Sequence, residues 1–377
     1  MKSYKVPLKY PKPDINNFLK GIRGEITPVK PLMCEYLIDD ALMKPILVNY
    51  LGRTWIEKSE KTEYMGGQME FTKEDISIMN KWLDNQIAFW YHMGYDYVRV
   101  EVSTPLPAVS LITKDTAIGN QDHNRAWQGM DKGPVQTWED FDKYPWPEVN
   151  DDSFYIHNYL CNHLPDGMGF ISCHAGGVYE HVSRVMGYAG MCIALLENPD
   201  LVKAVTDKIG NIIRKYNDGL LQFDRLTAIF QGDDFGFKTG TLISPDDIRK
   251  YFIPWHKIYA KQAHDAGRLY LLHSCGKIDD IMADLVNDVK IDGKHSFQDD
   301  IMPIGVYKKK WGDKIALLGG VDVHKLSAFS PDDLRKYVRG IIDECHPKGR
   351  IAIGAGNSIT SYVPLGNYLT MIDEILK

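Results

Sequence analysis

The feature that most constrains the fold is a regular alternation of short apolar segments with longer amphipathic ones, from residue 167 to the carboxyl terminus. The short segments are typical of strands and the longer ones of helices, so the pattern predicts right-handed βαβ units around a parallel sheet. The predicted strands are "LMCEYL" from residue 32, "YVRVEV" from 97, "GMGFISCHA" from 167, "LTAIFQGDD" from 226, "LYLLHSCG" from 269, "IDGKHSF" from 291, "KIALLGGVD" from 314 and "RIAIGAG" from 350. About eight such strands close a TIM (β/α)8 barrel, so we expect this α/β fold.

The 377 residues are enough for one large domain or for two. We assign residues 25–377 to a single barrel domain and residues 1–24 to an N-terminal extension. Residues 104–152 contain several prolines and aromatic residues but few periodic signals, which predicts a loop-rich insertion over the barrel mouth. This insertion could supply aromatic walls for a substrate, or it could be a structural lid or a dimer contact.

Charge and cysteine content narrow the function classes. The formal net charge of −6 and the scattered basic residues argue against a nucleic-acid or acidic-membrane partner. No apolar run approaches the ~20 residues that a membrane span requires. The six cysteines lack regular spacing and read as reduced thiols. We therefore expect a cytoplasmic protein with neither a nucleic-acid nor a membrane partner.

A histidine and a cysteine stand two residues apart at the end of the strand "LYLLHSC". Because side chains alternate along a strand, Leu269, Leu271, His273 and Cys275 share one face. In a barrel, His273 and Cys275 would lie at the carboxyl end of the strand, where active sites are built. Both are good zinc ligands. The spacing alone leaves open a plainer interpretation, a hydrogen-bonded histidine beside a small buried thiol.

Other residues that can bind or catalyse follow the remaining strands. If the barrel is correct they converge on one mouth, although an acid such as Asp322 could instead cap a helix. These residues are Glu35, His174, Asp233, Asp234, His295, Asp322 and Asn357.

Three common enzyme motifs are absent from the sequence. None of its glycine-rich turns forms a Walker loop, and the turn "GAGNSI" lacks the lysine of that motif. Neither the dinucleotide fingerprint G-x-G-x-x-G as a strand-to-helix turn nor a G-x-S-x-G elbow is present. The sequence therefore gives little support to a nucleotide enzyme, a nicotinamide enzyme or a serine hydrolase.

The motif order "GDDFG", "LISP", "HSCG", "GGVD" and "GAGNSI…YVPLGNY" resembles the uroporphyrinogen decarboxylase superfamily over roughly residues 25 to 377. The resemblance implies a single TIM barrel and one of two activities, porphyrinogen decarboxylation or corrinoid-dependent methyl transfer at a zinc site. The decarboxylases carry an arginine-rich motif after the first strand and a histidine in the last-strand turn. Here these positions hold "LMCEYLID" and Ala355, so a substrate with many carboxylates would lack its cationic clamp.

The zinc methyltransferases of this superfamily carry H-x-C and a third cysteine in the last-strand turn. His273 and Cys275 match the pair, and Ala355 stands where the third cysteine is expected. We expect His295 as the third ligand, with Glu35 or Asp234 as the alternatives. The resemblance to ether-demethylating members further implies the residue roles that follow. Asp234 or Glu35 would be catalytic, and the substrate contacts would be Asp233, His174, Asp322 and Asn357.

The leading hypothesis is a methyltransferase that moves a methyl group from a small methylated substrate, expected to be methoxylated, to a cobalt corrinoid (cobalamin) on a small partner protein, with zinc at the mouth. The chain could also form a homodimer. A second hypothesis is a decarboxylase-like lyase that acts on a different carboxylic acid and needs neither metal nor corrinoid. A third is a non-catalytic paralogue that binds only a corrinoid or a partner. Metal content separates this third hypothesis from the first.

Overall fold

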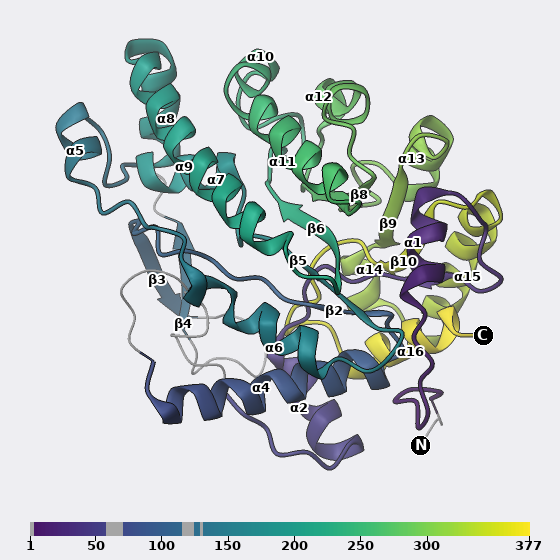
Figure 1. Cartoon of the computed structure of the whole chain (residues 1–377). Helices are drawn as coiled ribbons and strands as arrows, with labels where there is room; N and C mark the ends of the chain where they lie inside the picture. Colours follow the sequence, from purple (N-terminus) through teal and green to yellow (C-terminus); the bar gives the residue numbers. More distant parts are fainter. Residues whose placement is uncertain (1–3, 58–70, 115–123, 129–130) are drawn as a thin grey trace.

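A computed structural model describes residues 4–57, 71–114, 124–128 and 131–377. Eight parallel strands form one sheet with helices around its outside (Figure 1), which confirms the predicted TIM barrel. The strands are β1 (Leu32–Met33), β2 (Tyr97–Arg99), β5 (Gly169–Ser172), β6 (Leu226–Gly232), β7 (Leu269–His273), β8 (Gly293–His295), β9 (Ala316–Val321) and β10 (Ile351–Ala355). The helices that matter below are α1 (Ile15–Arg23), α2 (Asp40–Pro45), α4 (Lys73–His92), α7 (Val178–Met186), α8 (Tyr188–Glu197), α11 (Ile253–Asp265), α13 (Ile304–Trp311), α14 (Val323–Ala328), α15 (Pro331–Cys345) and α16 (Leu365–Ile375).

The strand order β1-β10-β9-β8-β7-β6-β5-β2 places β1 and β2 at the two edges of the sheet. Within the described residues no ladder joins these two edges, and a side chain bridges them instead. The hydroxyl of Tyr97 on β2 donates to the backbone oxygen of Glu35 at 3.2 Å. It also accepts from the backbone N–H of Glu35 at 3.1 Å. Tyr97 therefore satisfies backbone groups just after β1 where a strand pairing is missing.

Helix α1 covers the amino-terminal end of the barrel. Its first residue, Ile15, donates its backbone N–H to the oxygen of Gly167, just before β5, at 2.9 Å. Its last residue, Arg23, donates to the oxygen of Gly267, just before β7, at 3.0 Å. Phe18 is fully buried, with its ring 5.3 Å from that of Tyr97. The segment assigned as an N-terminal extension thus closes the floor of the barrel and leaves the opposite end open for a site.

Helix α4 begins directly after Thr72 because its first turn satisfies its own backbone. The hydroxyl of Thr72 accepts from the N–H of Asp75 at 3.1 Å, and the carboxylate of Asp75 accepts from the N–H of Thr72 at 2.9 Å. The buried face of the helix carries Trp82 and Trp90 at near-helical spacing. This face packs beside β2 and reaches the open end of the barrel.

The insertion over residues 104–152 is more regular than its sequence predicted. It contains the antiparallel hairpin of β3 (Ser110–Lys114) and β4 (Asn124–Gln128), followed by the short helix α5 (Trp138–Lys143). The hairpin and α5 lie together beyond one end of the barrel (Figure 1). The N–H of Val135 donates to the oxygen of Val185 on α7 at 3.0 Å, which attaches the insertion to the helix that follows β5.

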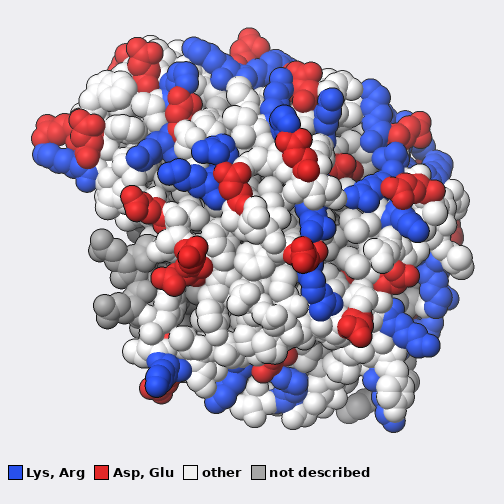
Figure 2. Space-filling model, viewed as in Figure 1, with Lys and Arg blue, Asp and Glu red and all other residues white. Residues whose placement is uncertain are grey.

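Acidic and basic side chains are interspersed on the face of the molecule shown in Figure 2. This distribution agrees with the scattered charge of the sequence. In the described part of the chain, a search for helices with the length and apolar character of a membrane span finds none.

The Tyr97 bridge leads to a stability prediction. Replacing Tyr97 by Phe removes the hydroxyl and leaves two buried backbone groups of Glu35 without a partner. The free energy of unfolding should fall by about 1–3 kcal/mol, measured by urea denaturation. The control Tyr10→Phe, at a side chain that is 76% exposed, should change it by less than about 0.5 kcal/mol. Equal stability of the two variants would show that the bridge does not support closure of the barrel.

Candidate metal centre at the barrel mouth

Strand alternation decides which side chains point into the barrel. His273, the last residue of β7, stacks on Tyr36 with ring centroids 4.0 Å apart and an interplanar angle of 9°. Tyr36 also packs against Phe230 of β6 at 5.0 Å. Tyr36, Phe230 and His273 thus point into the barrel. Because side chains alternate, a residue that follows one of them by two positions along an extended strand also points into the barrel.

Asp234, His273 and Cys275 come together at the carboxyl ends of β6 and β7. One potential ligand atom from each lies within 4.8 Å of the others. Nε2 of His273 is 3.3 Å from Sγ of Cys275 and 3.6 Å from Oδ1 of Asp234. Adjacent zinc ligands in a tetrahedron lie roughly 3.3–3.5 Å apart at usual bond lengths. An oxygen, a nitrogen and a sulfur at this spacing fit a divalent metal ion that prefers mixed ligands.

The structure places His295 behind His273 rather than beside Cys275. Nδ1 of His295 is 2.6 Å from Nδ1 of His273, and Nε2 of His295 is 3.0 Å from the oxygen of Ala355. Since that carbonyl only accepts, Nε2 of His295 carries its hydrogen and Nδ1 accepts from Nδ1 of His273. Nε2 of His273 is then left with a lone pair that faces Asp234 and Cys275. His295, expected as a ligand, therefore has both ring nitrogens engaged and orients the imidazole that can bind the ion.

The protonation of the cluster follows from its burial. Burial lowers the pKa of His273 to about 3, so its imidazole is neutral and can bind a metal. Burial, with a smaller effect from Asp234, raises the pKa of the Cys275 thiol to about 12. Partial burial also raises the pKa of Asp234. A cation held here would favour the thiolate that metal binding requires.

Asn357, predicted as a substrate contact, lies at the cluster. Its Nδ2 is 3.3 Å from Sγ of Cys275, and Oγ of Ser296 lies 3.7 Å from the same sulfur. Asn357 also lines a cavity of about 670 Å³ beyond β8, β9 and β10, together with Asp322 and His324. Two side-chain donors, from Asn357 and Ser296, thus approach the sulfur of Cys275.

Glu35 points away from the mouth. Tyr36 occupies the interior, so its neighbour Glu35 faces the helix layer. Both carboxyl oxygens of Glu35 lie 3.1 Å from the backbone nitrogen of Ala355, and Tyr368 of α16 is close enough for their charges to interact. Complete burial raises the pKa of Glu35 well above its usual range. The catalytic position expected for Glu35 is therefore not one that its side chain reaches.

Asp233 likewise takes the side opposite Asp234. Its carboxylate accepts from the N–H groups of Tyr179 and Glu180 at the start of α7, at 3.0 and 2.9 Å. It is also 2.9 Å from Nε2 of His256 on α11. These contacts join β6 to two helices and leave Asp233 fully buried, so the side chain expected to bind substrate instead holds the fold together.

Two further predicted substrate contacts have structural partners. His174 is fully buried, with Nε2 2.9 Å from Oγ1 of Thr104. Asp322 caps α14, since its Oδ1 accepts from the N–H of Lys325 at 3.1 Å. Its Oδ2 accepts from the N–H of Asp299 at 3.0 Å. Asp322 therefore caps a helix, which was the alternative to substrate binding. It also lines the cavity of about 670 Å³ beside Asn357.

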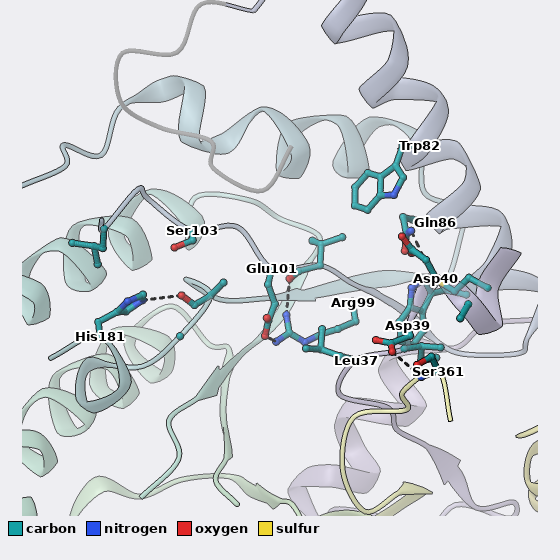
Figure 3. A pocket seen from close by; sticks show the side chains of 18 of the residues that line it. Leu37, Asp39, Asp40, Trp82, Gln86, Arg99, Glu101, Ser103, His181 and Ser361 are labelled. Atoms are coloured by element: carbon teal, nitrogen blue, oxygen red, sulfur yellow. Dashed lines mark hydrogen bonds and ion pairs between the residues drawn. The ribbon is translucent and has the colours of Figure 1, made fainter. Parts of the chain in front are cut away.

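A cavity of about 690 Å³ opens on the other side of the mouth (Figure 3). Arg99, the last residue of β2, and Glu101, two residues further on, form an ion pair on its wall, in which the Arg99 side chain is fully buried. The guanidinium of Arg99 also donates to the oxygens of Val100 and Phe230 at 2.5 and 3.0 Å. It lies 5.0 Å from the ring of Tyr36, which stacks on His273. The side chain of Arg99 and the ring of Tyr36 therefore lie between this cavity and His273.

Sequence reasoning missed Glu180, which is close enough for its charge to interact with Asp234 of the cluster and with Glu101 on the cavity wall. Its Oε2 accepts from the N–H of Gly177 at 3.1 Å, which caps α7. Burial, followed by the charges of Asp234 and Asp233, raises the pKa of Glu180 well above its usual range. A carboxyl group whose pKa is raised can act as a general acid. The sequence feature that could have identified Glu180 is its position in the first turn of a helix that begins directly after Gly176 and Gly177.

Comparisons with known proteins show the family to which this chain belongs. The sequence model of the uroporphyrinogen decarboxylase (URO-D) family matches residues 131–377. No curated protein matches the chain. Among solved structures, a methyltransferase from Methanosarcina mazei is similar over 97% of this chain and 98% of its own, with 15% identity and a TM-score of 0.67, a likeness that shows the fold alone. A putative vitamin-B12 independent methionine synthase from Listeria monocytogenes has 8% identity over 93% of this chain and 96% of its own, and its TM-score of 0.47 carries no argument. Because the family match spans well over half of the chain and the fold agrees with it, the chain belongs to the uroporphyrinogen decarboxylase family.

Proposed function

We propose that the chain is a metal-assisted methyltransferase that moves a methyl group from a small methoxylated substrate to a cobalt corrinoid on a separate small protein. The observation that carries the proposal is the convergence of Asp234, His273 and Cys275 at the barrel mouth, beside a cavity of substrate size. Family membership and the shared fold of a methyltransferase support it.

We infer that the ion is zinc, with Asp234 in place of the cysteine that the resemblance expects at Ala355. Carboxylate, imidazole and thiolate are all zinc ligands, and three protein ligands leave a fourth position for the substrate. When bound, the ion supplies a Lewis acid that stabilises negative charge on the leaving oxygen. His295 takes the role of fixing the orientation and tautomer of His273, through the contacts with Ala355 described above.

The proton for the leaving group is assigned to Glu180. In the reaction the oxygen keeps the electron pair of the broken carbon–oxygen bond, and the Co(I) acceptor supplies the pair for the new carbon–cobalt bond. The released oxygen then takes a proton from the carboxyl group of Glu180, which the solvent replaces. This role replaces the one expected of Glu35, whose side chain faces the helix layer.

The alternatives predict different chemistry at the same mouth. A lyase for a carboxylic acid would need a cation free to bind the carboxylate. Arg99 lines the larger cavity, but its guanidinium is already engaged by Glu101 and by backbone oxygens. A non-catalytic paralogue would bind metal or corrinoid without turnover, which the zinc content and the methyl-transfer assay described below detect together.

The first prediction concerns metal content. The parent chain, purified and incubated with zinc, should retain about one zinc per chain, whereas Asp234→Ala, His273→Ala and Cys275→Ala should retain little, as measured by elemental analysis. His295→Ala should keep all three ligands but lose about 10–100-fold in zinc affinity, because His273 loses the partner that fixes its tautomer.

Matched control variants distinguish the loss of a metal ligand from a general loss of folded structure. Cys192→Ala removes a partly buried thiol on α8, and His163→Ala removes an exposed imidazole, both outside the cluster. Both should keep the zinc content of the parent. Zinc absent from the parent, or retained in all three ligand variants, would contradict the site.

The second prediction tests the reaction. The zinc-loaded chain with cob(I)alamin and a panel of methoxylated aromatic compounds should form methylcobalamin, followed by absorbance. Glu180→Gln should lower the rate about 10²–10⁴-fold with unchanged zinc content, since it removes only the proton donor. The control Glu197→Gln, at an exposed position at the end of α8, should keep the parent rate.

The outcomes of this assay separate the hypotheses. Zinc binding without methylcobalamin from any donor would favour the non-catalytic paralogue. Release of carbon dioxide from an acid substrate without zinc would favour the lyase. An unchanged rate in Glu180→Gln, with methylcobalamin still formed, would remove only the assignment of the proton donor.

A further inference from the structure

The three ligands of the candidate metal site come from two different strand ends. His273 is the last residue of β7 and Cys275 follows it, whereas Asp234 comes two residues after the end of β6. The backbone pairing of the two strands reaches only as far as Asp233, whose N–H donates to the oxygen of His273 at 2.9 Å. The distance from Asp234 to the other two ligands therefore depends on contacts beyond the sheet.

Ser274, which lies between the histidine and the cysteine ligand, bonds to both neighbouring strand ends. Its side chain is fully buried, and its Oγ accepts from the buried N–H of Phe235, the residue after Asp234, at 3.1 Å. Its own N–H donates to the oxygen of His295 on β8 at 2.7 Å. Ser274 thus fixes its segment against the residue next to one ligand and against the histidine that orients another.

A second hydrogen bond joins the ends of β6 and β7 in the opposite direction. Oδ1 of Asp234 accepts from the backbone N–H of Cys275 at 2.8 Å. The end of β7 therefore donates to the carboxylate of one ligand, while the end of β6 donates to the hydroxyl of Ser274. A movement of either strand end away from the other breaks both hydrogen bonds and leaves a buried N–H without a partner.

Two glycines bring the loops after β6 and β7 into backbone contact. A Cβ added to Gly236 would lie 2.6 Å from the backbone oxygen of Cys275, and one added to Gly276 would lie 2.3 Å from the backbone carbon of Gly236. Gly276 also has a φ of +74°, which favours glycine. Atoms that are not bonded do not approach so closely, so a larger residue at Gly236 would push the two loops apart.

We propose that Ser274 and Gly236 are positioning residues of the candidate metal site, which hold the ends of β6 and β7 at the spacing where the three ligands bind one ion. The inference rests on the proposed function for the presence of the ion, and it adds how the spacing of the ligands is set. Gly236 has no side chain, and the hydroxyl of Ser274 is bonded to Phe235, so both act through the ligands beside them.

Loss of the hydroxyl tests Ser274. In Ser274→Ala the N–H of Phe235 has no acceptor, so the end of β6 can move and the zinc affinity, measured by competition with a chromophoric chelator, should fall about 10–100-fold. The matched control is Ser172→Ala on β5, because Ser172 is also fully buried and its Oγ lies 2.9 Å from Nε2 of His157. Both variants should lower the urea midpoint, but Ser172→Ala should stay within about threefold of the parent zinc affinity. The parent affinity in Ser274→Ala, or an equal loss in Ser172→Ala, overturns the inference.

A wedge between the loops tests Gly236 by a different change. Gly236→Ala removes no hydrogen-bonding group, and its methyl group should separate the ligands and lower the zinc affinity at least about tenfold. The control Gly240→Ala lies in the same loop, where an added Cβ meets nothing within 4 Å, and it should keep the parent affinity. Equal zinc affinities in these two glycine variants overturn the inference.

Hydrogen exchange tests the same contacts in the zinc-free chain. Peptides that cover residues 233–237 should exchange at least about tenfold faster in Ser274→Ala than in the parent, because the N–H of Phe235 loses its acceptor. Ser172→Ala should leave this exchange unchanged, and equal exchange in Ser274→Ala and the parent overturns the inference.

The outcomes also separate this inference from the proposed function. Zinc binding that depends on Ser274 and Gly236, without methyl transfer from any donor, would defeat only the proposed function. Methyl transfer by the parent, with the zinc affinity unchanged in Ser274→Ala and Gly236→Ala, would defeat only this inference.

Discussion

The pleat of the strands in a closed parallel barrel is the constraint on which the rest of this molecule depends. Each strand end offers one side chain to the interior and the next to the helix layer. On β6 this separates Asp234, at the mouth, from Asp233, which holds α7 and α11. The same rule separates Tyr36 from Glu35 after β1. Acids that are adjacent in sequence thereby acquire unrelated roles.

Ala355, the last residue of β10, contributes to the candidate site through its backbone carbonyl and N–H rather than through its side chain. Ala355 offers only a methyl group at the mouth, yet its carbonyl receives Nε2–H of His295 and its N–H is shared by the carboxyl oxygens of Glu35. Because this carbonyl takes Nε2–H of His295, Nδ1 of His295 accepts from Nδ1 of His273. The lone pair of His273 is therefore on its Nε2, which faces Asp234 and Cys275. A small residue at this position therefore contributes to the candidate site by orienting a ligand.

Much of the fold could be predicted because apolar periodicity reports which face a segment buries. Even β1, a ladder of two residues, stood out from the polar sequence around it. The strand ends predicted that His273 and Cys275 lie together at the mouth, but the third position was expected for His295, with Asp234 as one of two alternatives. The same alternation of side chains on every strand predicts that Asp233 and Glu35 face the helix layer rather than the mouth. The pairing of Arg99 with Glu101 and the approach of Glu180 depend on the stagger of neighbouring strands and helices, which local sequence does not specify.

The pairing of β1 with β10 also determines the stage of synthesis at which the candidate metal site can form. Leu32 pairs with Ala352, and the aromatic ring that covers His273 comes from the residues directly after β1. A chain still emerging from the ribosome has made His273 and Cys275 before β10 is available to hold β1 in place. An ion at the candidate site would thus meet a complete set of neighbours only after β10 has been made.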